Sequence, residues 1–261
     1  MLREALTFYG SQGRSDLPGF ISLLGALPEH ASTMTRAAEQ AAEIGQNLKA
    51  AAINDPLFGG AGQAVDPGVL LTPAPGHRAR VSVISMIGLA SEQQREGFVN
   101  QLQMALFAWI KQHPAGDRPL GGLLVMDEAQ NFAPSTRSTI SLRSTLALSS
   151  QARKYGLGLV FATQSPTGLH NHIPGNAATQ FYGLLNSATQ IAYAKELARV
   201  KGGLVPDISR LRAGNFYLAA EGQAFHRIRS PWCLSFHPQS PPTTEDVLRL
   251  AQPGRAQAGS P

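Results

Sequence analysis

The feature that most limits what this chain can fold into is a run of four apolar residues that ends in two acids. The stretch GGLLVMDEAQ, residues 121–130, has the pattern of a buried strand that stops at Asp127 and Glu128. A buried strand has little reason to end in paired carboxylates unless a cation or a reacting group lies beyond it. The stretch therefore predicts a sheet in the core and a polar site at the end of one strand.

The composition is that of a globular protein without a disulfide framework. Of the 261 residues, 43% are hydrophobic and 15% are charged, which suits one domain with a large core, with or without appendages. The single cysteine, Cys233, excludes paired disulfides and a four-cysteine zinc site, and it favours a reducing compartment. No leader sequence opens the chain, and no apolar run approaches the roughly 18 residues of a membrane helix. We therefore expect a cytoplasmic protein that does not contact a membrane.

The chain is basic, with a formal net charge of +5 and a pI near 9.7. A polyanion such as DNA is therefore a possible partner. The basic residues are nevertheless scattered singly or in pairs, and no block of five or more occurs. Charge alone leaves open whether this surface contacts nucleic acid or is an ordinary solvated one.

The order of elements predicts an α/β core between a helical segment and a tail. Residues 1–55 favour helices, with a cap at Ser32 or Thr33 for the longest, and residues 56–79 form a loop rich in Gly and Pro. The predicted strands cover residues 80–87, 121–126, 156–164 and 180–185, with a hairpin at 215–230 that turns at Glu221-Gly222. The predicted helices cover residues 91–113 with a cap at Ser91, 138–154, 189–200 and 246–250. The expected division is 1–75, 76–238 and a mobile tail, 239–261.

Polar side chains follow two strands of this predicted core. Alternating strands and helices favour a mostly parallel sheet covered by helices on both faces. In such sheets the chemistry lies beyond the carboxyl ends of the strands. Asp127 and Glu128 follow one strand, and Thr163 and Gln164 follow another. The four side chains are therefore expected at one edge of the sheet.

Four apolar residues followed by Asp-Glu form the pattern of a Walker B strand. Asp127 would accept hydrogen bonds from water on Mg²⁺, a small cation that keeps several of its waters. Glu128 would orient the water that attacks ATP and act as its general base, and Gln164 could sense the γ-phosphate. In the alternative, both acids merely begin a helix and bind its free N–H groups. Two consecutive buried strands with polar ends favour the nucleotide site.

The two strands together resemble a known family. LLVMDEAQ, followed after a helix by QARKYGLGLVFATQSP, resembles the C-terminal half of the ATPase core of the HerA/FtsK superfamily. The resemblance covers about residues 80–238 and is closest to HerA-like bacterial ATP-binding proteins. It implies a RecA-like P-loop NTPase core, a homo-oligomeric hexameric ring with ATP between subunits, and DNA as a possible substrate.

The resemblance also assigns roles to individual residues. It makes Asp127 the Mg²⁺ residue, Glu128 the catalytic base and Gln164 the polar sensor. Arg153 stands where the family often carries a basic residue, and it would reach a phosphate in a neighbouring subunit. The alternative for Arg153 is a cation that the C-terminus of a helix favours. Residues 210 and 212, both Arg, are weaker candidates for a phosphate contact.

The sequence lacks the phosphate-binding half of such a site. A P-loop, GxxxxGK[ST], holds phosphates with backbone N–H groups and a Lys, and none occurs. In the nearest stretch, FYGSQGRS, Arg14 replaces the Lys and Phe8 the first Gly. The family's P-loop lies upstream of a helical insertion, which residues 1–75 resemble. We therefore expect an incomplete core that needs a P-loop from another chain or an upstream segment.

Two alternative hypotheses for the function of this chain predict different features. A non-catalytic remnant or interaction module of the same fold would bind nucleotide weakly or not at all. A hydrolase on an α/β sheet would need a GxSxG nucleophile elbow, and the sequence contains none. A missing P-loop strand would leave two apolar strand edges facing a gap in the sheet.

Overall fold

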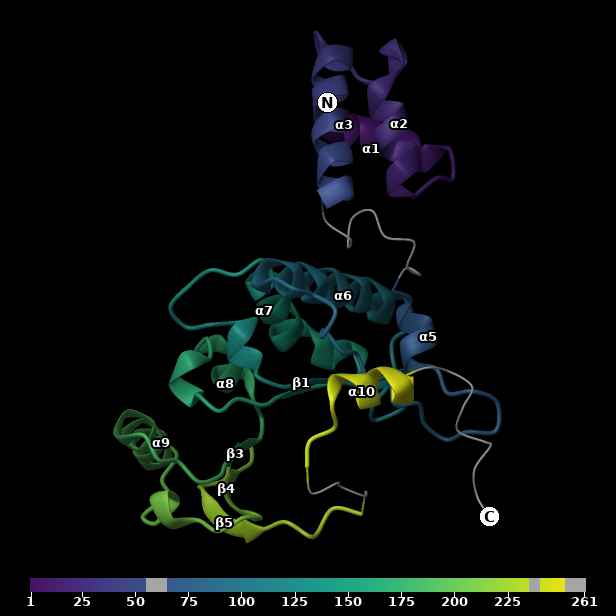
Figure 1. Ribbon diagram of the computed structural model, residues 1–261. Coiled ribbons are helices and arrows are strands. Elements are labelled where there is room, and N and C mark those ends of the chain that lie inside the picture. The colour runs from purple at the N-terminus through teal and green to yellow at the C-terminus, as the bar shows by residue number, and fades with distance from the viewer. Residues whose placement is uncertain (55–64, 235–239, 252–261) are drawn as a thin grey trace. The chain divides into compact units, whose positions relative to one another are not determined.

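A computed structural model describes residues 1–54, 65–234 and 240–251 of the chain (Figure 1). It divides the chain into two compact units, Met1–Val65 and Asp66–Pro261. Within these described ranges, no helix has both the length and the apolar character needed to cross a membrane. The predicted mobile tail lies outside them at residues 239 and 252–261, as does part of the predicted loop, residues 56–64.

The N-terminal unit is helical, as predicted. It contains α1 (Leu2–Ser11), α2 (Leu17–Gly25), η1 (Glu29–Ala31) and α3 (Ala37–Asn54). The longest helix begins at Ala37, so the predicted caps at Ser32 and Thr33 are wrong. Both hydroxyls instead donate hydrogen bonds to the carboxylate of Glu4 in α1, and Thr33 does so at 3.0 Å. The hydroxyls that could have capped α3 therefore tie the loop before it to α1.

The stretch nearest to a P-loop does not have the structure of one. Residues 8–11 complete α1, and no strand precedes them. The next helix, α2, is capped by Asp16, whose Oδ1 accepts a hydrogen bond of 2.7 Å from the amide of Gly19. This local structure agrees with the sequence in placing no phosphate loop between Phe8 and Ser15.

The second unit combines helices with two small sheets. Its first part contains α5 (Pro67–Leu71), α6 (Glu92–Gln112), β1 (Gly122–Met126), η2 (Ala129–Asn131), α7 (Leu142–Gln151), η3 (Ala152–Tyr155) and β2 (Leu157–Phe161). Its second part contains η4 (Pro166–Gly168), α8 (His172–Asn176), β3 (Gln180–Tyr182), α9 (Ala188–Val200), η5 (Ile208–Arg210), β4 (Asn215–Ala219), β5 (His226–Arg229) and α10 (Thr244–Ala251). Apart from residues 80–87, each predicted strand and helix of this unit is present, but the predicted strand 180–185 is shortened to β3, and α5 lies in the predicted loop.

The parallel sheet consists of β1 and β2, paired in register from Gly122 with Leu157 to Met126 with Phe161. Figure 1 shows α6 and α7 on the same side of β1. The side chain of Leu148 in α7 packs there against Ile110 of α6 and Leu157 of β2. Ser91 begins α6 with the predicted cap, reinforced by the side chain of Gln94 in a capping box. The helix over this sheet is thus fixed by its own sequence.

The opposite face of the parallel sheet is open. Three side chains point to that face: Leu123 is 49% exposed, Val125 59% and Val160 44%. The prediction that helices cover both faces is therefore wrong for the part of the chain that the structure describes. Apolar strand residues of this kind are normally buried on both faces of a parallel sheet.

The predicted strand at residues 80–87 is also wrong. Those residues form no strand in the structure, although Ser82 and Met86 each contact another part of the unit. The hydroxyl of Ser82 donates a hydrogen bond of 2.8 Å to the carbonyl of Leu70, and Met86 packs into the cluster around Met126. Val81 and Val83 are each 87% exposed. A β-branched run gains little as a strand when nothing buries its side chains.

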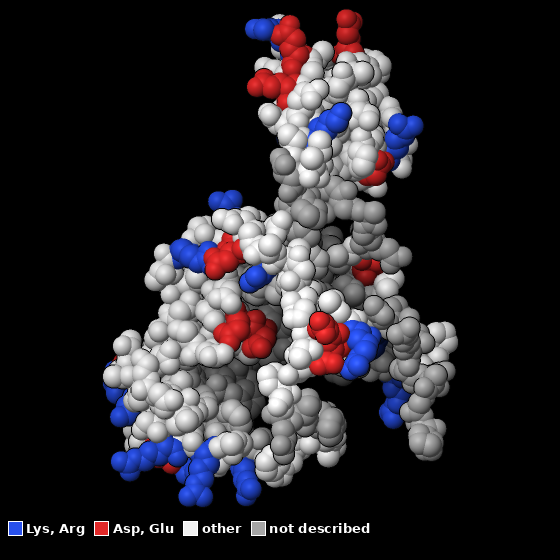
Figure 2. All heavy atoms as spheres, in the orientation of Figure 1, with Lys and Arg blue, Asp and Glu red and all other residues white. Residues whose placement is uncertain are grey.

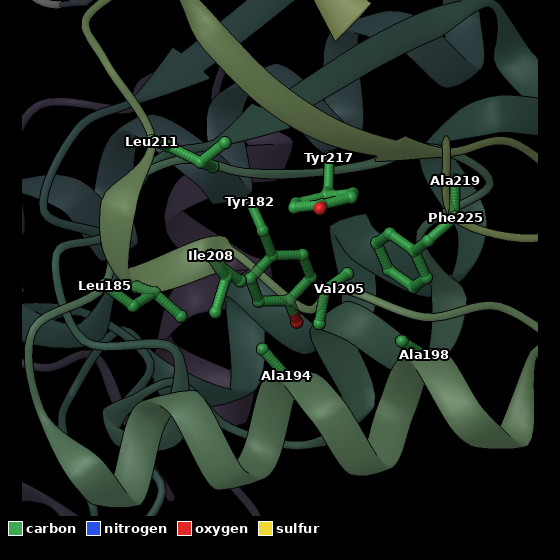
Figure 3. Packing of buried hydrophobic residues seen from close by; sticks show 10 residues of the cluster. All are labelled: Tyr182, Leu185, Ala194, Ala198, Val205, Ile208, Leu211, Tyr217, Ala219 and Phe225. Atoms are coloured by element: carbon green, nitrogen blue, oxygen red, sulfur yellow. The ribbon is translucent and has the colours of Figure 1, made fainter. Parts of the chain in front are cut away.

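The second sheet is antiparallel, in the order β3-β4-β5. The predicted hairpin is confirmed, and Gly222 adopts a φ of +73° in its turn. One face packs Tyr182 and Tyr217 against α9, where Ala194 and Ala198 allow close approach (Figure 3). Burial in this cluster raises the pKa of Tyr182 well above its ordinary value. The predicted mostly parallel sheet is thus a parallel pair and a separate antiparallel sheet.

Gly156, between η3 and β2, should be the least replaceable glycine of this unit. Its φ is +78°, and an added Cβ would lie 2.2 Å from the Cβ of Ala115. Gly116 has a φ of +59° and open space around it. Gly156→Ala should therefore lower the free energy of unfolding by about 2–3 kcal/mol, and Gly116→Ala by about 1 kcal/mol. Urea denaturation measures both, and equal losses would contradict the close contact.

Candidate functional site

The predicted site residues after β1 and β2 lie side by side. Two backbone hydrogen bonds of 2.9 Å continue the pairing beyond the strands, from the amide of Ala162 to the carbonyl of Met126 and from the amide of Ala129 to the carbonyl of Ala162. They place the residue pair 127–128 next to the pair 163–164. The prediction that parallel strands bring these ends together is confirmed for this edge of the sheet.

Glu128 is the centre of the hydrogen bonds at this edge. The amide of Gln164 donates to its Oε1, across the two strands. The amide of Gln130 donates to its Oε2 at 2.6 Å. Asp127 is exposed, and its Oδ1 accepts the backbone N–H of Glu128 at 2.9 Å. The two acids thus differ, because Glu128 is held on both oxygens whereas Asp127 faces solvent.

The backbone at Glu128 is in the left-handed region, with φ 49° and ψ 45°. A residue with a Cβ adopts this conformation at a cost of about 1–2 kcal/mol. Such conformations concentrate at functional sites, where the surrounding structure holds them in place. The chain leaves β1 through this residue and enters η2 directly after it.

Two further residues of the site were not expected from the sequence. Gln130 bonds to Glu128, and its Oε1 accepts a hydrogen bond from the hydroxyl of Thr163. Gln190, near the start of α9, donates from Nε2 to the carbonyl of Gln164 at 3.4 Å. Gln130 could have been found, because it follows Glu128 by two residues. No sequence signal connects Gln190 to this edge.

A buried side-chain amide holds the end of β1 against α6 and α7. Gln103 of α6 is 1% exposed. Its Nε2 donates to the hydroxyl of Thr145 at 2.9 Å and contacts the sulfur of Met126 at 3.3 Å. Its Oε1 accepts a hydrogen bond of 2.6 Å from the hydroxyl of Ser144. A fully bonded buried amide of this kind specifies one packing of α6, α7 and β1.

An ion pair fixes the loop that follows the acids. Glu96 of α6 is 6% exposed and accepts a hydrogen bond of 2.8 Å from Nη1 of Arg137. The other oxygen of Glu96 accepts the backbone N–H of Ile140 at 3.1 Å. This loop is also joined to the loop after β2, since the amide of Ser135 donates to the carbonyl of Gly168 at 2.8 Å. Both loops that carry site residues are therefore held in place.

Arg153 lies at the other end of β2. It precedes the strand, which runs from Leu157 to Phe161, whereas Gln164 follows it. Five residues of strand span about 16 Å, so Arg153 does not share a ligand with Gln164 of the same chain. Its side chain is 88% exposed, and its Nη1 lies 4.0 Å from Glu221. The role predicted for Arg153 concerns a neighbouring subunit, and it stays a prediction.

The donor set at this edge suits one type of cation. In the ranges that the structure describes, no three His, Cys, Asp or Glu side chains form a group that could enclose a metal ion. A single exposed carboxylate such as Asp127 fits Mg²⁺, which keeps its own waters and needs few protein ligands. The nearby carboxylate and amides can orient a water molecule by hydrogen bonds.

Comparisons with known proteins give limited similarity. No protein-family profile and no curated protein matches the chain. Among solved structures, the genome packaging NTPase from Sulfolobus turreted icosahedral virus 2 in complex with sulfate is 16% identical, with 52% of this chain and 63% of that chain covered and a TM-score of 0.42. The same protein in complex with ATP-gammaS is 17% identical over 59% of this chain and 68% of that chain, with a TM-score of 0.42.

The DNA-packaging ATPase from Sulfolobus Turreted Icosahedral Virus is 15% identical, with 66% of this chain and 74% of that chain covered and a TM-score of 0.42. In the first of these alignments the chain spans less than two thirds of the viral protein's length. All three TM-scores lie below 0.5. The chain itself has an α/β arrangement, and its parallel strand pair ends in a hydrogen-bonded polar site.

Proposed function

We propose that this chain is the Walker B half of a HerA-like ATP-binding and ATP-hydrolysing motor protein, with a P-loop supplied from elsewhere. The observation that carries the proposal is the hydrogen bond from Gln164 to Glu128 across two adjacent strand ends, with Asp127 exposed beside it. The alternative, in which the acids serve the start of a helix, is less favoured. The side chain of Glu128, the residue directly before η2, does not cap that short helix.

In this proposal each residue has one task. Asp127 would hold hydrated Mg²⁺, and the bound cation would neutralise phosphate charge of ATP. Glu128 accepts the proton of the attacking water, and Gln164 orients that water or the γ-phosphate. Gln130 is a positioning residue, because it holds one carboxylate oxygen of Glu128 in place.

The unpaired strand edges of the two sheets support a P-loop strand that comes from outside this sequence. Among the described residues, the strand orders are β1-β2 and β3-β4-β5, so β1, β2, β3 and β5 each have one free edge. Unpaired edges and an exposed apolar face are features that proteins normally cover. A further strand beside β2 would bring its own loop to the edge that carries Gln164.

The assembly is part of the same proposal. In a hexameric ring, the end of β2 that carries Arg153 would have to meet the polar edge of the next subunit. The exposure of Arg153 is compatible with such a contact, and the weak ion pair with Glu221 would not prevent it. DNA as the moved substrate, and a cytoplasmic location, follow from the family resemblance alone.

The proposal is tested by supplying the missing half. The reading frame upstream of Met1, or an adjacent gene, should encode a GxxxxGK[ST] motif. When that segment and this chain are produced together, the purified complex should hydrolyse ATP in the presence of Mg²⁺. A complex that contains the motif but neither binds nor hydrolyses ATP would favour the alternative, a non-catalytic interaction module of the same fold.

A further inference from the structure

Both carboxylate oxygens of Glu128 are tied to the loop that follows β2. Gln164 donates directly to Oε1. The second tie has two steps, because Gln130 donates to Oε2 at 2.6 Å and its own Oε1 accepts a hydrogen bond from the hydroxyl of Thr163. Thr163 and Gln164 are neighbours in the chain, so the four residues form a closed ring of contacts. Thr163 thus reaches the proposed general base through one intermediate residue.

Uncharged groups hold this carboxylate in place. Among the described residues, no Lys or Arg side chain forms an ion pair with Glu128. Figure 2 shows basic side chains gathered instead over the region that carries α9, β4 and β5 in Figure 1. The orientation of the carboxylate therefore depends on amide and hydroxyl donors.

The chemistry of these groups sets the direction of each hydrogen bond. An ionised carboxylate only accepts, so Gln130 must turn its NH₂ group toward Glu128. The amide oxygen of Gln130 then points at Thr163, whose hydroxyl can donate to it. An amide turned the other way would place its oxygen against the carboxylate and remove a donor from it. The hydroxyl of Thr163 therefore stabilises the orientation of Gln130 that Glu128 needs.

The backbone fixes the position of the Thr163 hydroxyl. Its oxygen accepts the backbone N–H of Ser165 at 3.0 Å and lies 3.1 Å from the carbonyl of Ser165, which is a second acceptor for its proton. That carbonyl already accepts the backbone N–H of Gly168 at 2.9 Å. In the part of the chain that the structure describes, Oε1 of Gln130 has Thr163 as its donor. Thr163 is half-buried, so its loop limits where the hydroxyl can lie.

We propose that Thr163 is a positioning residue for Glu128 and acts through the amide of Gln130. The inference rests on the proposed function, and it adds a residue that itself touches neither ATP nor water. The terminal torsion of a glutamate side chain is broad when nothing holds the carboxylate, and a general base must be aligned with the proton it takes. Losing the hydroxyl should therefore lower kcat and leave ATP binding unchanged.

The first test measures ATP turnover by the complex of this chain with the P-loop segment. Thr163→Val replaces the hydroxyl by a methyl group and should lower kcat about 3–10-fold, with KM within about twofold of the original. Thr163→Ser keeps the hydroxyl and should restore kcat. In a chain that carries Gln130→Ala, Thr163→Val should lower kcat no further, because the route through Gln130 is already lost. Unchanged kcat in Thr163→Val, or a full further loss in the Gln130→Ala chain, overturns the inference.

The second test uses the chain alone and needs no activity. NMR of the chain with glutamine labelled at its side-chain nitrogen shows the NH₂ signal of Gln130, which is assigned by its loss in Gln130→Ala. Thr163→Val should move this signal, and Thr163→Ser should move it less. Thr7→Val removes a hydroxyl in α1 that donates to the carbonyl of Arg3 at 2.9 Å, and it should leave the signal in place. A signal that Thr163→Val moves no further than Thr7→Val does overturns the inference.

The two tests separate this inference from the proposed function. Turnover that Glu128→Gln abolishes and Thr163→Val leaves unchanged would overturn the role of Thr163 and leave the ATPase role intact. A complex that does not hydrolyse ATP would contradict the ATPase role, and the NMR signal of Gln130 would still decide whether Thr163 orients that amide.

Discussion

Glu128→Gln should lower ATP turnover by the completed site about 10²–10⁴-fold and leave ATP affinity within a few-fold. The amide keeps the size of the carboxylate and can still bond to Gln130 and Gln164. It cannot accept the proton of the attacking water. Since Glu128 faces the water in this account, the chemical step is lost while binding remains. Phosphate release and nucleotide binding are measured on the complex that contains the P-loop segment.

The control for this prediction is another carboxylate-to-amide change. Glu43 is exposed on α3 in the N-terminal unit, and Glu43→Gln should leave both turnover and affinity unchanged. Gln130→Ala should lower turnover less than Glu128→Gln, because it frees one oxygen of a carboxylate that Gln164 still holds. Turnover that survives Glu128→Gln would show that another group is the general base.

Leu148→Ala should lower the free energy of unfolding of the second unit by about 2–5 kcal/mol. Leu148 is 1% exposed and packs between α6 and the parallel strand pair, against Ile110 and Leu157. Removing its side chain leaves a cavity, because helices on one side and a strand on the other limit how far the site can collapse. Both tryptophans belong to the second unit, so their fluorescence follows its unfolding in urea.

The matched control is Leu204→Ala. Leu204 is 76% exposed, so the same chemical change should alter the free energy of unfolding by no more than about 0.5 kcal/mol. A loss at Leu148 as small as the loss at Leu204 would mean that α7 does not pack on the strand pair as described. Because Leu148 lies away from the polar edge, its effect would reach ATP turnover only through the amount of folded protein.

The elements that the sequence predicts well are those with local signals. Ser91 and Gln94 form a capping box, so the start of α6 is fixed by neighbouring residues. The apolar runs before Asp127 and Gln164 each form a strand because burial of one face against α6 and α7 stabilises them. The site then follows from topology, since two parallel strands necessarily bring their carboxyl ends to one edge.

The features that the sequence predicts poorly depend on partners far along the chain. Residues 80–87 have the composition of a strand, yet strand formation needs a neighbour that pairs with the backbone and a layer that buries Val81 and Val83. Gln190 joins the site only because α9 begins near the loop after β2. The ring contact between Phe181 and Phe216 depends on the register of β3 and β4, which the sequence does not give.

The central claim is that this chain holds the metal and water half of an ATP site and lacks the phosphate-binding half. A titration of the purified chain with a fluorescent ATP analogue and Mg²⁺ tests it most directly, first alone and then together with the P-loop segment. We expect no submicromolar binding by the chain alone, and tight binding together with hydrolysis by the complex. Submicromolar binding by the chain alone would contradict the claim.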